Sequence, residues 1–186
     1  MPQVVVSNVT LVFTQCMLNP SEFGGYNYSF IINSEEWCKT VRTAIHGQKT
    51  KLWDDDKNTD EFILSKTCRS RDDVKYDIVK EMMKEDDVLV QVKATHPIEN
   101  TKDVALSRGS TANVLIDIFE YIYAKKQFIC VKSHPERGCT VQPINVVEYA
   151  DSMFFKKETE NGAAGTDKGL AADNSDVESE VAQYLF

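Results

Sequence analysis

Residues 112–124 alternate between two kinds of side chain over their whole length, and they follow a glycine, Gly109. Period-two alternation places successive residues on opposite faces of a strand, so this stretch predicts one long strand. One face is aliphatic and consists of Val114, Ile116, Ile118 and Ile122. The other face carries Leu115, Asp117, Phe119, Tyr121 and Tyr123. Tyrosine hydroxyls and a carboxylate need water or polar partners, and we therefore expect the second face to be half exposed.

The sequence predicts further strands on both sides of this one. They are expected at residues 4–13, 26–33, 88–95, 127–132 and 141–149, where β-branched and aromatic residues cluster between turn residues. The first two of these strands are expected to form a hairpin. The domain is therefore predicted to be mostly β.

Two helices are predicted between the strands. Ser34 is expected to cap a helix over residues 34–46, in which Trp37, Val41 and Ile45 recur at helical spacing. This register places the Trp37 indole on the buried side of the helix. A shorter helix is predicted over residues 71–84, with Val74, Ile78 and Met82 on its apolar stripe.

Charge divides the chain of 186 residues into two parts. Residues 158–186 carry seven acidic residues and one lysine, and large apolar residues are almost absent from them until the last six positions. Such a segment cannot bury enough surface to offset its ordering entropy, so we expect an acidic flexible C-terminal tail after a globular domain of residues 1–157. Most of the formal net charge of −8 belongs to the tail. The acidity of the chain therefore does not exclude a polyanionic ligand for the domain.

Several classes of protein do not fit the sequence. No apolar run reaches the roughly 18–20 residues of a membrane span, and the first residues lack the features of a signal peptide, so we expect a cytoplasmic protein that does not bind membranes. The five cysteines are scattered without a Cys-x-x-Cys pair, which favours reduced, mostly buried thiols.

A basic window between two tryptophans suggests nucleic-acid binding. Residues 38–52 contain no acid, and they include Lys39, Arg42, Lys49 and Lys51. Cations that follow phosphates and rings that stack on unpaired bases are the elements of a groove for single strands. Trp53 falls in a predicted loop, where stacking on a base and packing in the fold are both open.

Two more groups of basic residues follow along the chain. Tyr121, Tyr123, Lys125, Lys126, Phe128 and Lys132 combine aromatic rings with cations around a predicted turn, which favours binding. Lys66, Arg69, Arg71 and Lys75 are interrupted by acids, which favours a solvated surface.

The sequence leaves two other kinds of function open. The acidic clusters at residues 54–56, 72–73 and 85–87 could hold a divalent metal in a nuclease or another DNA-processing enzyme, although consecutive acids point in different directions. Cys130, His134 and Cys139 could bind zinc with a fourth ligand. No phosphate-binding loop, Gly-x-Ser-x-Gly or His-Glu-x-x-His motif is present. A structural or adaptor protein that acts through its tail is a further alternative.

Four segments together resemble the bacteriophage replicative single-stranded-DNA-binding proteins of the podovirus type. They are the opening strand that ends near Asn19-Pro20, the run from Gly24 through Tyr26 to Trp37, the run from Arg108 through Gly109 and Ala112 to Tyr123, and the run from Pro143 to Tyr149. The resemblance covers most of residues 1–150. It implies an OB-fold, which is a five-stranded antiparallel barrel with inserted helices, and a basic, aromatic groove for unpaired strands.

The resemblance also implies an acidic tail that ends in an aromatic residue, recruits a polymerase or a helicase, competes with DNA and can mediate homodimer contacts. Six uncharged residues follow the last acid, Glu180, so either Phe186 alone or a short helix with Val177, Val181 and Leu185 on one face could be the docking element.

These observations predict a non-enzymatic phage protein, in the host cytoplasm, that coats single-stranded DNA in replication and recombination. No cofactor and no metal are expected. The predicted stacking residues are Trp53, Tyr121, Tyr123 and Phe128, and the predicted phosphate contacts are Lys39, Arg42, Lys49, Lys51, Lys125 and Lys126. The predicted partner-binding residues are Glu178, Glu180, Tyr184, Leu185 and Phe186.

Overall fold

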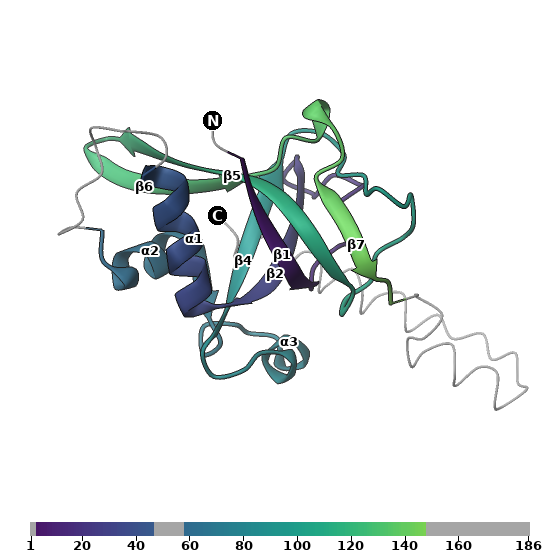
Figure 1. Cartoon of the computed structure of the whole chain (residues 1–186), viewed down its shortest axis with the longest axis horizontal. Coiled ribbons are helices and arrows are strands. Elements are labelled where there is room, and N and C mark those ends of the chain that lie inside the picture. The colour runs from purple at the N-terminus through teal and green to yellow at the C-terminus, as the bar shows by residue number, and fades with distance from the viewer. Residues whose placement is uncertain (1–2, 47–57, 148–186) are drawn as a thin grey trace, which may run out of the picture.

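The computed structural model describes residues 3–46 and 58–147 (Figure 1). Its strands are β1 (Gln3–Leu11), β2 (Tyr26–Asn33), β3 (Cys68–Ser70), β4 (Asp87–Ala94), β5 (Thr111–Tyr123), β6 (Lys126–Lys132) and β7 (Val141–Asn145). Its helices are α1 (Ser34–His46), α2 (Asp60–Thr67), α3 (Asp77–Met82) and the short 3-10 helix η1 (Pro135–Arg137). None of the described helices has the length and apolar character that a membrane span requires.

Five of the strands close into a ring in the order β1-β2-β4-β6-β5, because β5 also pairs with β1. All neighbours in the ring are antiparallel except β4 and β6, which are parallel and meet at one residue pair, Lys93 and Lys132. A partly open Greek-key barrel of five strands is the OB-fold. The predicted fold class is thus confirmed, with one parallel contact in place of a fully antiparallel ring. The two other described strands, β3 and β7, extend it by pairing with β4 and β5.

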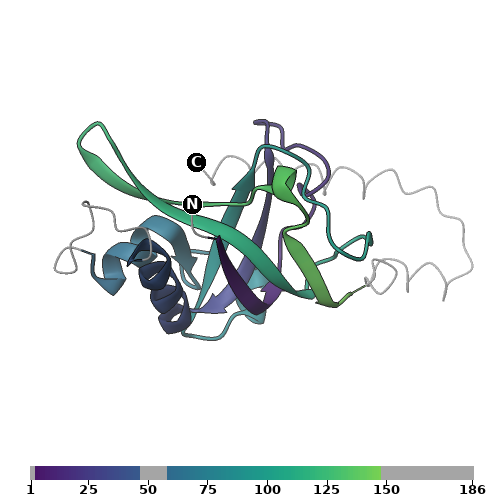
Figure 2. The same ribbon diagram turned by 45° about the horizontal axis from the view of Figure 1, so that its top comes forward.

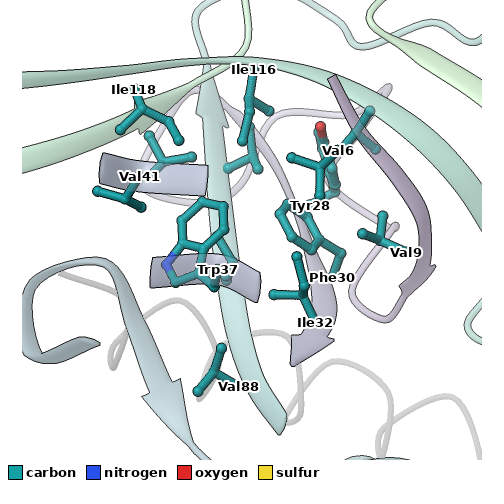
Figure 3. Close-up of a cluster of buried hydrophobic side chains, with 14 of the residues drawn as sticks. Val6, Val9, Tyr28, Phe30, Ile32, Trp37, Val41, Val88, Ile116 and Ile118 are labelled. Carbon is teal, nitrogen blue, oxygen red and sulfur yellow. The ribbon is translucent and has the colours of Figure 1, made fainter. Parts of the chain in front are cut away.

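The barrel encloses a hydrophobic core, and α1 packs against it (Figure 3). Trp37 is fully buried, and its indole Nε1 donates a hydrogen bond to Thr67 Oγ1 at 2.7 Å. Its ring meets Phe30 edge to face, with 5.9 Å between ring centroids. The predicted burial of Trp37 is confirmed. The side chain that caps α1 is Asn33 and not Ser34, because Asn33 Oδ1 accepts the backbone N–H groups of Glu35 and Glu36.

A second apolar cluster covers part of the outer face of β2 and β4. Ile31 and Leu89 lie opposite each other on this face, and both are buried. They pack with Val12 and with three residues of the segment around α3, namely Val74, Val79 and Met83. This segment, residues 74–83, therefore covers part of the outer face of the barrel, and we call it the plug.

The same segment corrects the predicted helix at residues 71–84. Only Asp77–Met82 is helical, and residues 71–73 form a turn. The predicted stripe is wrong at Ile78, which is 51% exposed, while the neighbouring Val79 is fully buried. Val74 and Val79 both pack against Ile31 of β2 and Leu89 of β4. They are five positions apart, and one continuous helix would not place them on the same face.

The predicted strands overlap the observed ones, and the longest strand is β5, but the strand predicted at residues 141–149 ends at Asn145, and residues 148–149 lie outside the described residues. The hairpin of β1 and β2 is confirmed, although these strands share only two residue pairs. The sequence analysis did not predict α2 or β3. Ile122 was placed on the buried aliphatic face and is instead 54% exposed, because the end of β5 extends beyond the barrel (Figure 2). The predicted tail, residues 158–186, lies outside the described residues.

Candidate nucleic-acid interface

A row of aromatic rings lies on the outer face of the hairpin formed by β5 and β6. The antiparallel register places Tyr121 directly opposite Phe128, and alternation places Phe119 and Tyr123 on the same face. The rings of Tyr121 and Phe128 are stacked, with 5.3 Å between centroids and 17° between planes. The Phe119 ring lies 6.3 Å from Tyr121 at a tilt of 43°. The structure thus brings together three of the four predicted stacking residues.

The end of this hairpin projects away from the barrel (Figures 1 and 2). Tyr121 is 42% exposed and Tyr123 is 72% exposed. The two turn residues, Ala124 and Lys125, have φ angles of 49° and 63°, and positive φ at both central residues is the property of a type I′ turn, which matches the twist of the flanking strands. Lys125 and Lys126 are both exposed at the turn. Two predicted phosphate-binding residues therefore lie next to the most exposed ring.

Two further lysines contact the aromatic row. Lys132 Nζ lies 5.8 Å from the centroid of the Phe119 ring. Lys66 Nζ, from α2, lies 5.8 Å from Phe128 and 5.7 Å from Phe62. The sequence analysis assigned Lys66 to a solvated surface. The Phe62 and Lys66 spacing of four residues is a signal that could have identified this cation–π pair if α2 had been predicted.

The basic surface continues from the hairpin onto β4. Lys93 lies opposite Lys132 across the parallel contact, and alternation along β4 places Gln91 on the same outer face. The half-buried thiol of Cys130 lies near both lysines. Its pKa is raised by burial, and the two ammonium groups oppose this rise. Sequence reasoning missed Lys93, although the alternation of residues 88–95 contains the signal for its face.

Asp117 begins the outer-face row, but it is not half exposed as predicted. Its side chain is 1% exposed because the β6–β7 connection covers it. His134 Nε2 lies 3.0 Å from Asp117 Oδ2, and Arg137 Nη1 lies 3.8 Å from the same oxygen. The carboxylate thus lies beside the imidazole of His134 and the guanidinium of Arg137.

The other predicted phosphate contacts are not brought to this face. Arg42 forms an ion pair with Asp60 and donates a hydrogen bond to the Asn58 carbonyl, which ties α1 to the start of α2. Lys39 is exposed on α1, and α1 packs on the core side of β5. Lys49, Lys51 and Trp53 lie outside the described residues, as do Glu178, Glu180, Tyr184, Leu185 and Phe186.

OB-folds bind oligonucleotides on the face of their second and third strands, at the loop between their fourth and fifth strands, and at the loop between their first and second strands. In this barrel the first of these surfaces is β2 and β4, where the plug around α3 covers Ile31 and Leu89. The second corresponds to the turn between β5 and β6. The candidate interface therefore consists of the hairpin's outer face, Lys66 and the uncovered end of β4 at Lys93. We call this set the hairpin interface.

The alternative metal sites are not formed by the residues that the structure describes. In residues 3–46 and 58–147, no group of three or more His, Cys, Asp or Glu side chains is placed to hold a metal ion. Cys130, His134 and Cys139 do not form such a group, nor do the acids at residues 72–73 and 85–87. Residues 54–56 are not described.

No protein-family model matches the sequence, and no curated protein matches it. Among solved structures, the chain is similar to the single-stranded-DNA-binding protein from bacteriophage Enc34, with 10% identity, a TM-score of 0.49, and coverage of 86% of this chain and 90% of that one. The same protein in complex with single-stranded DNA gives 12% identity and a TM-score of 0.49, covering 78% and 88% of the two chains. The bacteriophage T7 protein gp2.5, also a single-stranded-DNA-binding protein, gives 10% identity and a TM-score of 0.43, covering 82% and 97%.

Proposed function

We propose that this protein binds single-stranded DNA at the hairpin interface, without reading base sequence and without enzymatic turnover. The observation that carries this proposal is the row of Phe119, Tyr121, Tyr123 and Phe128 beside Lys125, Lys126 and Lys132. Aromatic rings stack on bases of any identity, and lysines attract the phosphates between them. A duplex hides the faces of its bases, so this surface favours unpaired strands.

The proposal is tested by fluorescence anisotropy with labelled oligo-dT and with a duplex of the same length. We expect tight binding of the single strand, weak binding of the duplex, and no loss of binding in EDTA. The logarithm of the binding constant should fall with log salt at a slope of about −0.7 per phosphate contacted. A preference for the duplex, or cleavage of the oligonucleotide in magnesium, would refute the proposal.

We further propose that the protein coats DNA during phage replication and recombination and that residues 158–186 regulate this binding. A polyanion tethered to a cationic surface has an effective concentration of about millimolar, so it can compete with DNA for the lysines. Deletion of residues 158–186 should then tighten binding of oligo-dT, most strongly at low salt. Weaker binding after the deletion would show that the tail contributes to the fold, to DNA contact or to a homodimer.

The end of the tail is the proposed partner-binding element. Removal of Tyr184, Leu185 and Phe186 leaves all seven tail acids in place. The truncated protein should bind oligo-dT as the full chain does and should lose a polymerase or helicase of the same phage in a pull-down. Retention of that partner would contradict the assignment of these residues.

A further inference from the structure

His134 lies between two carboxylates at the start of the β6–β7 connection. Its Nε2 is 3.0 Å from Asp117 Oδ2, and its Nδ1 is 2.8 Å from Glu136 Oε1. The His134 side chain is only 17% exposed, and that of Asp117 is 1% exposed. A neutral imidazole has one N–H group and one lone pair, so it can donate to one carboxylate only. Nδ1 is hydrogen-bonded to Glu136, whereas Nε2 approaches Asp117 Oδ2 at an ion-pair distance without hydrogen-bond geometry, so a protonated ring would be attracted by both carboxylates.

This charge cluster lies against the hairpin interface. Asp117 is directly opposite Lys132 in the β5–β6 ladder, and Lys132 contacts the ring of Phe119. A carboxylate beside Lys132 reduces the attraction of that lysine for phosphate. When it is protonated, His134 places a positive charge beside this carboxylate and opposes its effect.

The remaining charged neighbours come from three elements. Arg137, which is half exposed, approaches Asp117 at 3.8 Å, and His96 Nδ1, after β4, lies 3.7 Å from Glu136 Oε2. Lys93 on β4 is the ladder neighbour of Lys132. From β1, the residue opposite Asp117 is Gln3, which carries no charge. A backbone hydrogen bond and the contact with His134 hold the pKa of Glu136 below its usual range, so this carboxylate stays ionised.

We propose that His134 is a positioning residue of the hairpin interface and that its protonated form binds single-stranded DNA more tightly. This inference rests on the proposed function. Loss of the proton removes one positive charge beside Lys132 and turns a lone pair toward a carboxylate. By linkage, DNA binding then favours proton uptake at His134 to the same extent that the proton favours DNA.

The test is the Kd of labelled oligo-dT measured from about pH 5.5 to 8.5, the range in which histidine changes charge, at constant ionic strength. The chain has three histidines, which allows a matched set of His134→Gln, His96→Gln and His46→Gln. Wild-type affinity should fall about threefold toward alkaline pH, the effect of one unit charge about 7 Å from a phosphate in water. His134→Gln should remove this dependence and bind as weakly as the wild type does at alkaline pH. The other two variants should retain it.

Asp117→Asn separates a charge effect from a folding effect. The Asp117→Asn variant lacks the carboxylate, so it should bind oligo-dT at alkaline pH at least as tightly as the wild type does at acid pH. If His134 and Asp117 only stabilised the fold, His134→Gln and Asp117→Asn should both bind oligo-dT more weakly. NMR titration of the His134 ring in the free and DNA-bound protein should show that DNA shifts its deprotonation to higher pH.

Wild-type affinity that does not vary with pH, or a dependence that persists in His134→Gln, would overturn the inference. Absence of oligo-dT binding at every pH would instead refute the proposed function.

Discussion

Truncation of Tyr121 to alanine should weaken the binding of single-stranded DNA without unfolding the protein. The stacking of one base on an aromatic side chain contributes about 1–3 kcal/mol, which predicts a rise in Kd of roughly 5- to 150-fold. The truncation should also lower the free energy of unfolding, by the loss of ring stacking and of part of the buried area of Tyr121. Tyr121 is 42% exposed, and its stacked pair with Phe128 contributes about 0.5–1.5 kcal/mol beyond area burial.

A loss of this size leaves a domain of ordinary stability, about 5–15 kcal/mol, almost entirely folded. Reduced affinity could therefore not be explained by unfolded protein.

The matched control is Ile122→Ala. Ile122 is the next residue on the same strand, is 54% exposed and lies on the opposite face of the hairpin. Both variants and the wild type should be compared by anisotropy with oligo-dT and by urea unfolding. We expect a large rise in Kd for Tyr121→Ala and little change for Ile122→Ala. Equal losses of affinity in both variants would refute the assignment of the binding face.

Two further predictions concern the buried tryptophan of α1 and the reactivity of the cysteine thiols. Trp37→Phe removes the indole N–H that donates to Thr67 Oγ1 and leaves that buried hydroxyl with one partner fewer. It should lower the free energy of unfolding by roughly 1–3 kcal/mol in urea, and an unchanged midpoint would contradict the role of this bond. Among the thiols, Cys139 is exposed and should react first with a disulfide reagent at pH 8. Cys38 and Cys68 should react last, because burial raises their pKa values to about 11 and 12 and leaves little thiolate. Mass spectrometry of the reaction over time would detect any other order.

Local sequence patterns were sufficient to predict the strand at residues 112–124 and its aromatic face. Alternation alone assigns Phe119, Tyr121 and Tyr123 to one side, because the period of a strand does not depend on its neighbours. The same logic failed at Ile122. Its side of the strand is buried only where another element covers it, and the end of the hairpin has no such cover in the described structure.

The other members of the hairpin interface depend on contacts between distant segments. Lys66 reaches the aromatic row from α2, and Lys93 lies beside Lys132 through the single parallel pair of β4 with β6. Local spacing contains the pairing of Lys66 with Phe62 and the face of Lys93, but it does not show which helices and strands become neighbours, so the position of these lysines beside the aromatic row could not be predicted. The sequence spacing of His134 with Cys130 and Cys139 suggests a zinc ligand. In the structure His134 lies against Asp117 instead, because the β6–β7 connection folds over β5.

The position of the plug around α3 could also not be predicted from the sequence pattern. Val74 and Val79 suggest an imperfect helical stripe, but their burial is determined by Ile31 and Leu89 on the barrel. This packing covers the part of an OB-fold that would otherwise be the first candidate for base stacking. The position of the proposed binding face thus follows from tertiary structure and not from the composition of any one segment.

Photo-cross-linking provides the most direct test of where DNA binds. An oligo-dT with halogenated uracil at one position would be irradiated with the full-length protein, and the modified peptides would be identified by mass spectrometry. The hairpin interface predicts cross-links at Tyr121, Tyr123 or Phe128. Cross-links at Phe13 or Tyr76, beside the plug, with none on the hairpin, would contradict it and return the binding face to β2 and β4.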